Sequence, residues 1–443
     1  MYKIIHSIFI LVSVTISTSA QQTIDAKVDS SKFSFHFQLT AIDQQHPAFH
    51  APYSGTNSLI PKAEEALSLT TTMFLGTKLW KGASAFFNPE ISGGKGFSSA
   101  IGIAGFPNGE TFRIGDPTPA LYLARLFIRQ NIALGTDVDT VEDDVNQLKE
   151  YVPKKRISIT AGKFAIADMF DNNSYSHDPR TQFMNWSLMS NGAWDYPANT
   201  RGYTAGLAVE YITPLWAARI GTVLVPTYAN GPDLDYNYGK AHGETIELQK
   251  NLNFGQRKGI IRILGFRNTT RAADYRKVIN GYNNHTDTLD VISSRKYGSV
   301  KYGFGINGEQ ELTKDLGFFL RGSWNDGHTA TWAFTEIDKS VSFGLSLSGT
   351  RWARSADNMG LAVVVNGISK DHRDYLAAGG YGFIIGDGKL TNYRTENILE
   401  MYYNTKINKN MFVSADYQFI ENPAYNGDRG PINVFSIRAH IVI

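Results

Sequence analysis

The sequence predicts an all-β protein, a transmembrane antiparallel β-barrel of about 16 strands with short periplasmic turns and long external loops. Three observations predict it: a leader of the secretory type, many stretches in which apolar and polar residues alternate, and connections that are short and long in turn. No Ser/Gly linker or shift in composition divides the chain. We therefore expect one domain over residues 21–443.

Residues 1–20 have the residue order of a secretory signal peptide. Lys3 precedes an apolar run from Ile4 to Ile16, and small residues follow at 18–20. The apolar run is too short to span a membrane as a helix. We expect 1–20 to be removed on export, so that the mature chain begins at Gln21.

Alternation with a period of two predicts strands with one apolar and one polar face. It is clearest where Val341, Phe343 and Leu345 alternate with serine and glycine, and again over 411–419 and 435–441. The strands we predict are, in chain order, 33–42, 65–77, 81–91, 119–129, 155–164, 202–213, 215–226, 242–252, 259–267, 295–307, 316–325, 338–350, 359–370, 395–406, 410–420 and 432–442.

The connections decide between a soluble sandwich and a barrel. Every second connection is tight, as at 213–214 and 407–409, and the others are long, as at 165–201 and 371–394. That parity is typical of outer-membrane barrels and places both chain ends in the periplasm. In lipid, moreover, only a helix or a closed barrel pairs every backbone N–H and C=O group.

One connection departs from this parity. Residues 130–154 should form a short turn, yet they carry a run of acidic side chains: Asp137, Asp139, Glu142, Asp143 and Asp144. We expect an acidic periplasmic excursion with a short helix around Val145–Tyr151.

Composition excludes several function classes. The 43 Lys and Arg nearly balance 41 Asp and Glu, which removes the electrostatic reason to expect nucleic acid as a partner. The chain has no Cys, which excludes disulfides, thiol catalysis and Cys-ligated zinc. Pro47, between His46 and His50, disfavours the helical turn that a shared metal would need. We expect no metal and no cofactor.

Charged residues on the polar faces of the predicted strands are candidates for a water-filled lumen, because Arg or Lys on the lipid face would cost about 2–4 kcal/mol. Arg125 and Arg129 lie four apart, opposite a face that carries Tyr122 and Ala124. These charges could pair across the wall or contact a solute, and the sequence leaves both open. The other candidates on strands are Glu247, Arg262, Arg321, Glu400 and Asp416.

The long connection 165–201 combines aromatic rings with planar polar groups, a combination that suits the apolar faces and hydroxyl edges of a sugar. We expect it either to fold inward and narrow a pore or to cap the barrel from outside. Ser174 near His177 could suggest a hydrolase, but the spacing indicates no triad, and we expect no enzyme. The candidates in this connection are Asp171, His177, Asp178 and Arg180.

Several segments in order resemble the carbohydrate-selective porins of the OprB type. They are His46–Gly55, Phe87–Glu90, Tyr175–Phe183, Trp324–His328 with Phe334–Ile337, and, most specifically, Glu400–Asn404, Asp416–Ile420, Asp428–Pro431 and Arg438–His440. The resemblance implies a sixteen-stranded barrel for passive diffusion of sugars, narrowed by inward-folded external loops with Arg and acidic residues. On that basis Arg113 joins Arg125 and Arg129 as a candidate for the constriction.

The resemblance carries expectations about location and partners. We expect the cell outer membrane, with membrane lipid and small sugars as partners, and the barrel-assembly machinery and periplasmic chaperones during biogenesis. A monomer is favoured over a trimer. One departure is the C-terminus, which ends in Ile443 where such barrels commonly end in an aromatic residue. The alternatives are a general or anion-preferring diffusion pore and, less favoured, a barrel hydrolase.

Overall fold

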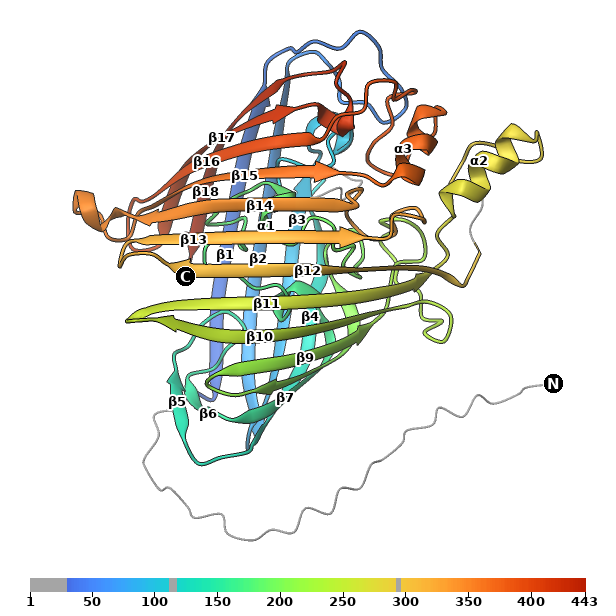
Figure 1. Ribbon diagram of the computed structural model, residues 1–443. Helices are drawn as coiled ribbons and strands as arrows, with labels where there is room; N and C mark the ends of the chain where they lie inside the picture. The colour runs from blue at the N-terminus through green and yellow to red at the C-terminus, as the bar shows by residue number, and fades with distance from the viewer. Residues whose placement is uncertain (1–29, 111–117, 292–295) are drawn as a thin grey trace, which may run out of the picture.

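A computed structural model describes residues 30–110, 118–291 and 296–443. Sixteen strands form one closed antiparallel barrel, as the sequence predicts (Figure 1). Each predicted strand lies within a few residues of an observed one. The barrel strands are β1 (Phe33–His46), β2 (Glu64–Trp80), β3 (Ala83–Gly94), β4 (Ala120–Ala133), β7 (Arg156–Phe164), β8 (Thr204–Ile212), β9 (Trp216–Val223), β10 (His242–Phe254), β11 (Arg257–Thr270), β12 (Ser299–Glu311), β13 (Leu316–Asn325), β14 (Lys339–Ser348), β15 (Asn358–Gly367), β16 (Glu396–Lys406), β17 (Met411–Glu421) and β18 (Ile432–Val442).

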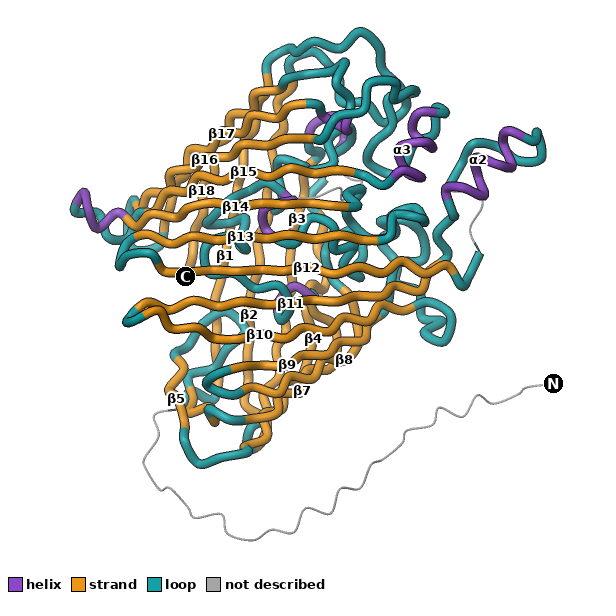
Figure 2. The backbone as a smooth tube through the Cα atoms, in the orientation of Figure 1, coloured by secondary structure: helices purple, strands orange, loops and turns teal. Residues whose placement is uncertain are grey.

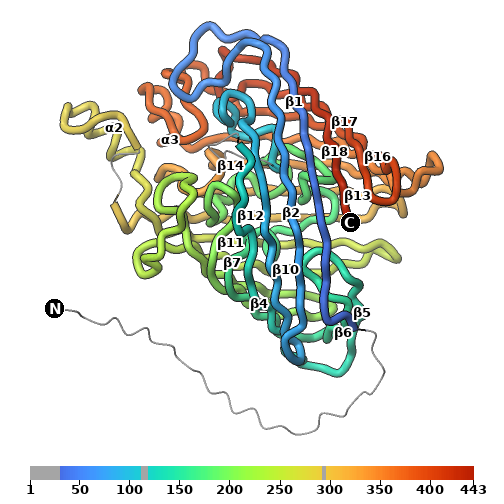
Figure 3. The backbone as a smooth tube through the Cα atoms, turned by 180° about the vertical axis from the view of Figure 1, so that it is seen from behind, coloured from blue at the N-terminus to red at the C-terminus, as the bar shows by residue number. Residues whose placement is uncertain are grey.

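The first and last strands close the barrel. β1 pairs with β2 on one side and with β18 on the other, where Gln38 lies opposite Val442. Seen from behind, β1 and β2 lie side by side with β18 next to them (Figure 3). The leader 1–20 lies outside the described residues.

Loops gather at one end of the barrel and inside it (Figure 2). The external loops carry the helices α2 (Tyr275–Asn283) and α3 (Lys370–Ala377), and the ion pair between Arg276 and Asp374, 3.1 Å, joins the two. A short helix, α1 (Trp186–Met189), lies between β7 and β8. Among the described residues, no helix has the length and apolar character needed to cross a membrane.

The alternation along each strand separates the two faces of the wall. On β14, Val341, Phe343 and Leu345 point outward and are 39–53% exposed, whereas Ser340 and Ser342 are buried inside. An outward apolar face on a closed barrel is typical of transmembrane barrels, where it meets hydrocarbon, so the barrel belongs in a lipid bilayer.

A charge on this outer face should destabilise the barrel. For Phe343→Arg, in the middle of β14, we expect a loss of about 2–4 kcal/mol in the free energy of unfolding, because the guanidinium would lie in hydrocarbon. Denaturant titration in phospholipid vesicles measures it. Phe343→Leu is the control and should cost less than about 1.5 kcal/mol. Equal stability of both variants would contradict a lipid-facing β14.

The helix expected around Val145–Tyr151 is wrong. Residues 134–155 form a second, two-stranded sheet of β5 (Val138–Val141) and β6 (Glu150–Pro153). Valine and tyrosine favour strands, and Asn146 turns the chain with a φ of 55°. We call this element the periplasmic hairpin, because it occupies a connection at the short-turn end of the barrel.

A bulge in β4 also corrects a predicted face. Asn88 pairs with Arg125 but Pro89 pairs with Leu123, so Ala124 is an extra residue on β4. Pro89 has no N–H group to donate to a regular ladder, which favours a bulge there. The bulge turns Tyr122 into the lumen, on the same side as Arg125 rather than opposite it, where its hydroxyl donates to Glu90.

Candidate permeation pathway

The segment 165–203, between β7 and β8, folds into the barrel and is held there by carboxylates of the wall. Glu247 of β10 accepts the backbone N–H of Asp171 at 2.7 Å, and Glu309 of β12 accepts that of Ser174 at 2.7 Å. Backbone N–H groups inside a barrel need acceptors. The wall carboxylates supply them, so the segment lies inside the barrel and is not an outer cap.

Arginines of the wall hold the carbonyl groups of the same segment. Arg321 of β13, fully buried, donates to Leu188 O at 2.8 Å and to the Asp171 carboxylate at 3.2 Å. Arg438 of β18 donates to Pro179 O at 2.6 Å and Gln182 O at 2.8 Å. Charge-assisted bonds of this kind are stronger than neutral ones, so these arginines hold the segment 165–203 against the wall.

A second segment, 95–110 after β3, also enters the barrel. Glu396 of β16 accepts the backbone N–H groups of Ala104 at 3.0 Å and Gly105 at 2.6 Å. The side chain of Asn185 joins the two segments by donating to Gly105 O at 2.9 Å. The inward loops that the resemblance implies are therefore present.

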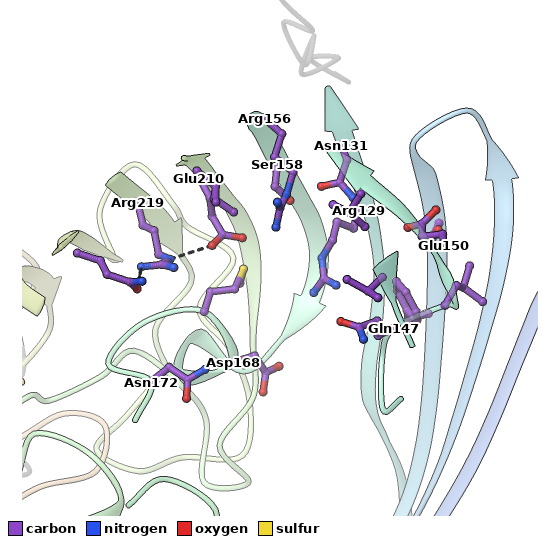
Figure 4. Close-up of a pocket in the computed structure, with 18 of the residues that line it drawn as sticks. Arg129, Asn131, Gln147, Glu150, Arg156, Ser158, Asp168, Asn172, Glu210 and Arg219 are labelled. Atoms are coloured by element: carbon purple, nitrogen blue, oxygen red, sulfur yellow. Dashed lines mark hydrogen bonds and ion pairs between the residues drawn. The ribbon is translucent and has the colours of Figure 1, made fainter. Parts of the chain in front are cut away.

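Among the described residues, two neighbouring cavities lie beside these segments. The larger holds about 690 Å³ and the smaller about 460 Å³. Arg129, Gln147, Asp168 and Asn172 line both cavities, so the two meet at these four residues. Figure 4 shows the smaller cavity, where Arg129, Arg156 and Arg219 come from the barrel wall, and Gln147 and Glu150 come from the periplasmic hairpin.

Paired charges line the larger cavity. Arg125 donates two parallel hydrogen bonds to the Asp168 carboxylate, at 2.6 and 2.7 Å. Burial by itself raises the pKa of the Asp168 carboxyl, but Arg125 overrides it and holds that pKa below its usual value. Arg180 likewise donates to Glu110 at 2.7 Å and to Gln38 at 2.7 Å. The cavity thus presents planar donors and acceptors to a solute.

Aromatic rings form another part of the same wall. Trp186 and Phe334 stack with their centroids 4.9 Å apart, and Phe334 and Tyr196 stack at 4.6 Å. All three line the larger cavity. Flat apolar rings beside charged planar groups suit the faces and edges of a pyranose.

The comparison with known families decides the identity. The profile of the OprB family, the carbohydrate-selective porins, matches residues 66–443. The chain belongs to the OprB family. The family is a family of porins, not of enzymes, and this OprB chain is a carbohydrate-selective porin of the outer membrane.

Solved structures show the same fold. The high-pH structure of Pseudomonas putida OprB has 17% sequence identity and a TM-score of 0.70, over 93% of this chain and 94% of that chain. The outer-membrane channel DcaP of Acinetobacter baumannii has 8% identity and a TM-score of 0.50, over 93% of this chain and 97% of that chain. No curated relative matches this sequence.

The predicted site residues of this OprB porin that the structure describes fall into two groups. One group lines a cavity: Arg125, Arg129, His177, Asp178, Arg180 and Arg262. The other group lines neither cavity. Asp171, Glu247, Arg321 and Glu400 belong to the inward segment or bond to it, and Asp416 accepts from Gln418, which in turn accepts from Asn185 of the segment. Arg113 lies outside the described residues.

Sequence reasoning missed several residues that line the cavities. Glu90 and Tyr203 bond to each other at 3.1 Å in the larger cavity, and Arg156 and Glu210 line the smaller one. For Glu90, Arg156 and Glu210, the position on the polar face of a strand was the available signal, whereas Tyr203 lies in the inward segment just before β8. Ser174 bonds to Glu309, and within the described part of the chain no hydrogen bond joins it to His177. That part also holds no cluster of three or more potential metal ligands.

Proposed function

We propose that sugars cross this porin passively through the larger cavity, then the junction at Arg129 and Asp168, then the smaller cavity. The observation that carries the proposal is the shared lining of the two cavities by the same four residues. Stacked aromatic rings and the Arg125–Asp168 pair on the approach supply the contacts that a sugar needs. Neither a cofactor nor an energy source is required for diffusion down a gradient.

Swelling of proteoliposomes tests the passage of sugars. We expect rapid swelling in isotonic glucose and slower swelling in a disaccharide, because both cavities are narrow and lined by fixed side chains. Empty liposomes are the control. Swelling no faster than theirs would refute passage of sugars.

A second candidate is a general or anion-preferring diffusion pore. Arg129 and Arg156 favour it, since both face the smaller cavity and, among the described residues, neither forms an ion pair with a carboxylate. Planar-bilayer recording separates the two candidates. A sugar site predicts that glucose reduces the ion current with saturation, whereas a general pore predicts only the small decrease that glycerol at matched viscosity causes.

We further propose that the porin is a monomer, exported through its leader and inserted with periplasmic chaperones and the barrel-assembly machinery. The support for a monomer is that one chain closes the barrel and encloses both cavities. The mass of the detergent-solubilised protein by light scattering tests the oligomeric state, and the N-terminal sequence of the mature protein tests cleavage before Gln21.

A further inference from the structure

The periplasmic hairpin lies partly inside the barrel, because the residues between its two strands enter the lumen. Asp144 to Gln147 line the larger cavity, and Val141, Gln147, Leu148, Glu150 and Val152 line the smaller one. Leu148 is 1% exposed. An element from the short-turn end therefore forms part of the wall of both cavities.

Three barrel strands hold the hairpin in this position. Asp143 pairs with His36 of β1 at 3.5 Å, and Glu150 pairs with Lys78 of β2 at 3.8 Å. Arg129 of β4 donates to Asn146 O at 3.2 Å. Because these partners lie on three strands of the wall, β1, β2 and β4, the hairpin contacts the inside of the wall as well as being joined to it at its two ends.

The hairpin and the segment 165–203 face each other where the cavities meet. Gln147 comes from the hairpin, Asp168 and Asn172 come from the inward segment, and Arg129 comes from the wall beside the hairpin. A solute that passes from one cavity to the other must pass between these two elements.

We propose that the periplasmic hairpin is one half of the size filter of the channel, opposed to the segment 165–203, and that Gln147 is its contact with the permeating solute. The inference rests on the proposed passage through both cavities. It assigns a role in solute selection to residues 134–155, the connection that is long where a short periplasmic turn is expected. The size of a pore and the groups that line it determine what it admits.

Removal of the hairpin is the direct test. Ala133 of β4 pairs with Arg156 of β7, so a two-residue Asn-Gly turn can replace residues 134–155 without a change in barrel register. We expect the single-channel conductance to rise by about twofold or more. The swelling rate in disaccharide should rise more than the rate in glucose, because the filter is widened. Unchanged conductance and an unchanged ratio of the two rates would overturn the inference.

If the shortened chain does not fold, a thiol variant tests whether the hairpin lies in the path of the solute. The native chain has no Cys, so Gln147→Cys carries a single thiol. A bulky methanethiosulfonate reagent should reduce the current through Gln147→Cys and leave Asp139→Cys unaffected, because the Asp139 side chain is 63% exposed and lines neither cavity. Equal, negligible effects on both variants would refute the inference.

The two proposals fail differently. If no variant admits glucose but the conductance still rises without the hairpin, the proposed sugar passage is wrong and the filter stands. If glucose enters the unaltered porin while neither hairpin variant changes the current, the passage stands and the filter is wrong.

Discussion

Arg321→Met should cost about 3–5 kcal/mol of stability, because it leaves the Asp171 carboxylate buried without its cationic partner. Both side chains are 1% exposed, and the guanidinium also loses its bonds to Leu188 O and Asp171 O. The barrel ladder itself is untouched. We therefore expect the loss as a lower thermal unfolding midpoint in detergent, together with a noisier and larger current as the segment 165–203 loosens.

Two variants show whether the buried charge is the cause. Arg267→Met removes an arginine that is paired with Glu244 and half exposed, and it should cost less than about 1 kcal/mol. Asp171→Asn combined with Arg321→Met removes both charges and should be more stable than Arg321→Met alone. If Arg321→Met unfolds at the same temperature as Arg267→Met, the anchoring role of Arg321 is wrong.

The wall could be predicted from the sequence because its signal is local. Each strand carries its own alternation, as Val341 to Leu347 do, and the tight turns mark where the strands end. The bulge at Ala124 could not be predicted from β4 alone, because it depends on the residue of β3 that lies opposite. That residue is Pro89. A single added residue exchanges the two faces beyond it, which is why Tyr122 was assigned to the wrong side.

The interior could be predicted only in part, because its contacts join distant residues. Glu400 accepts the N–H of Asn185, which is 215 positions away in the sequence. The sequence shows that Glu400 lies on a polar face, but it does not show whether the carboxylate contacts a solute or a backbone amide. The two strands of the hairpin could not be predicted for a different reason. Its acidic run suits a solvated helix or loop as well as a strand, and its strands are only four residues long.

Arg129→Gln combined with Arg156→Gln should change the ion selectivity of the channel. Other arginines of the smaller cavity have acidic partners: Arg219 pairs with Glu210 at 2.8 Å, and Arg262 with Glu309 at 3.6 Å. Within residues 30–110, 118–291 and 296–443, Arg129 and Arg156 donate only to the carbonyl oxygens of Asn146 and Pro153. Acidic groups such as Glu210 lie near both, but within those ranges neither guanidinium is in a direct ion pair, so more of their charge acts on passing ions than that of Arg219 or Arg262. Glutamine keeps an N–H donor for each carbonyl, so the hairpin should stay in place.

The expected shift follows from the Coulomb energy. A unit charge at about 4 Å contributes about 1 kcal/mol even in water, so loss of two charges, about 2 kcal/mol together, should move the ratio of anion to cation permeability by more than about tenfold toward cations at low salt. Reversal potentials in a salt gradient measure this ratio. Arg257→Gln, a change at a tight turn where Arg257 pairs with Glu311, is the control and should move it little. A neutral sugar carries no charge for these arginines to attract, so swelling in glucose should change less than swelling in a uronate of similar size. If both sugars change equally, the two arginines act by size or hydrogen bonding and not by charge.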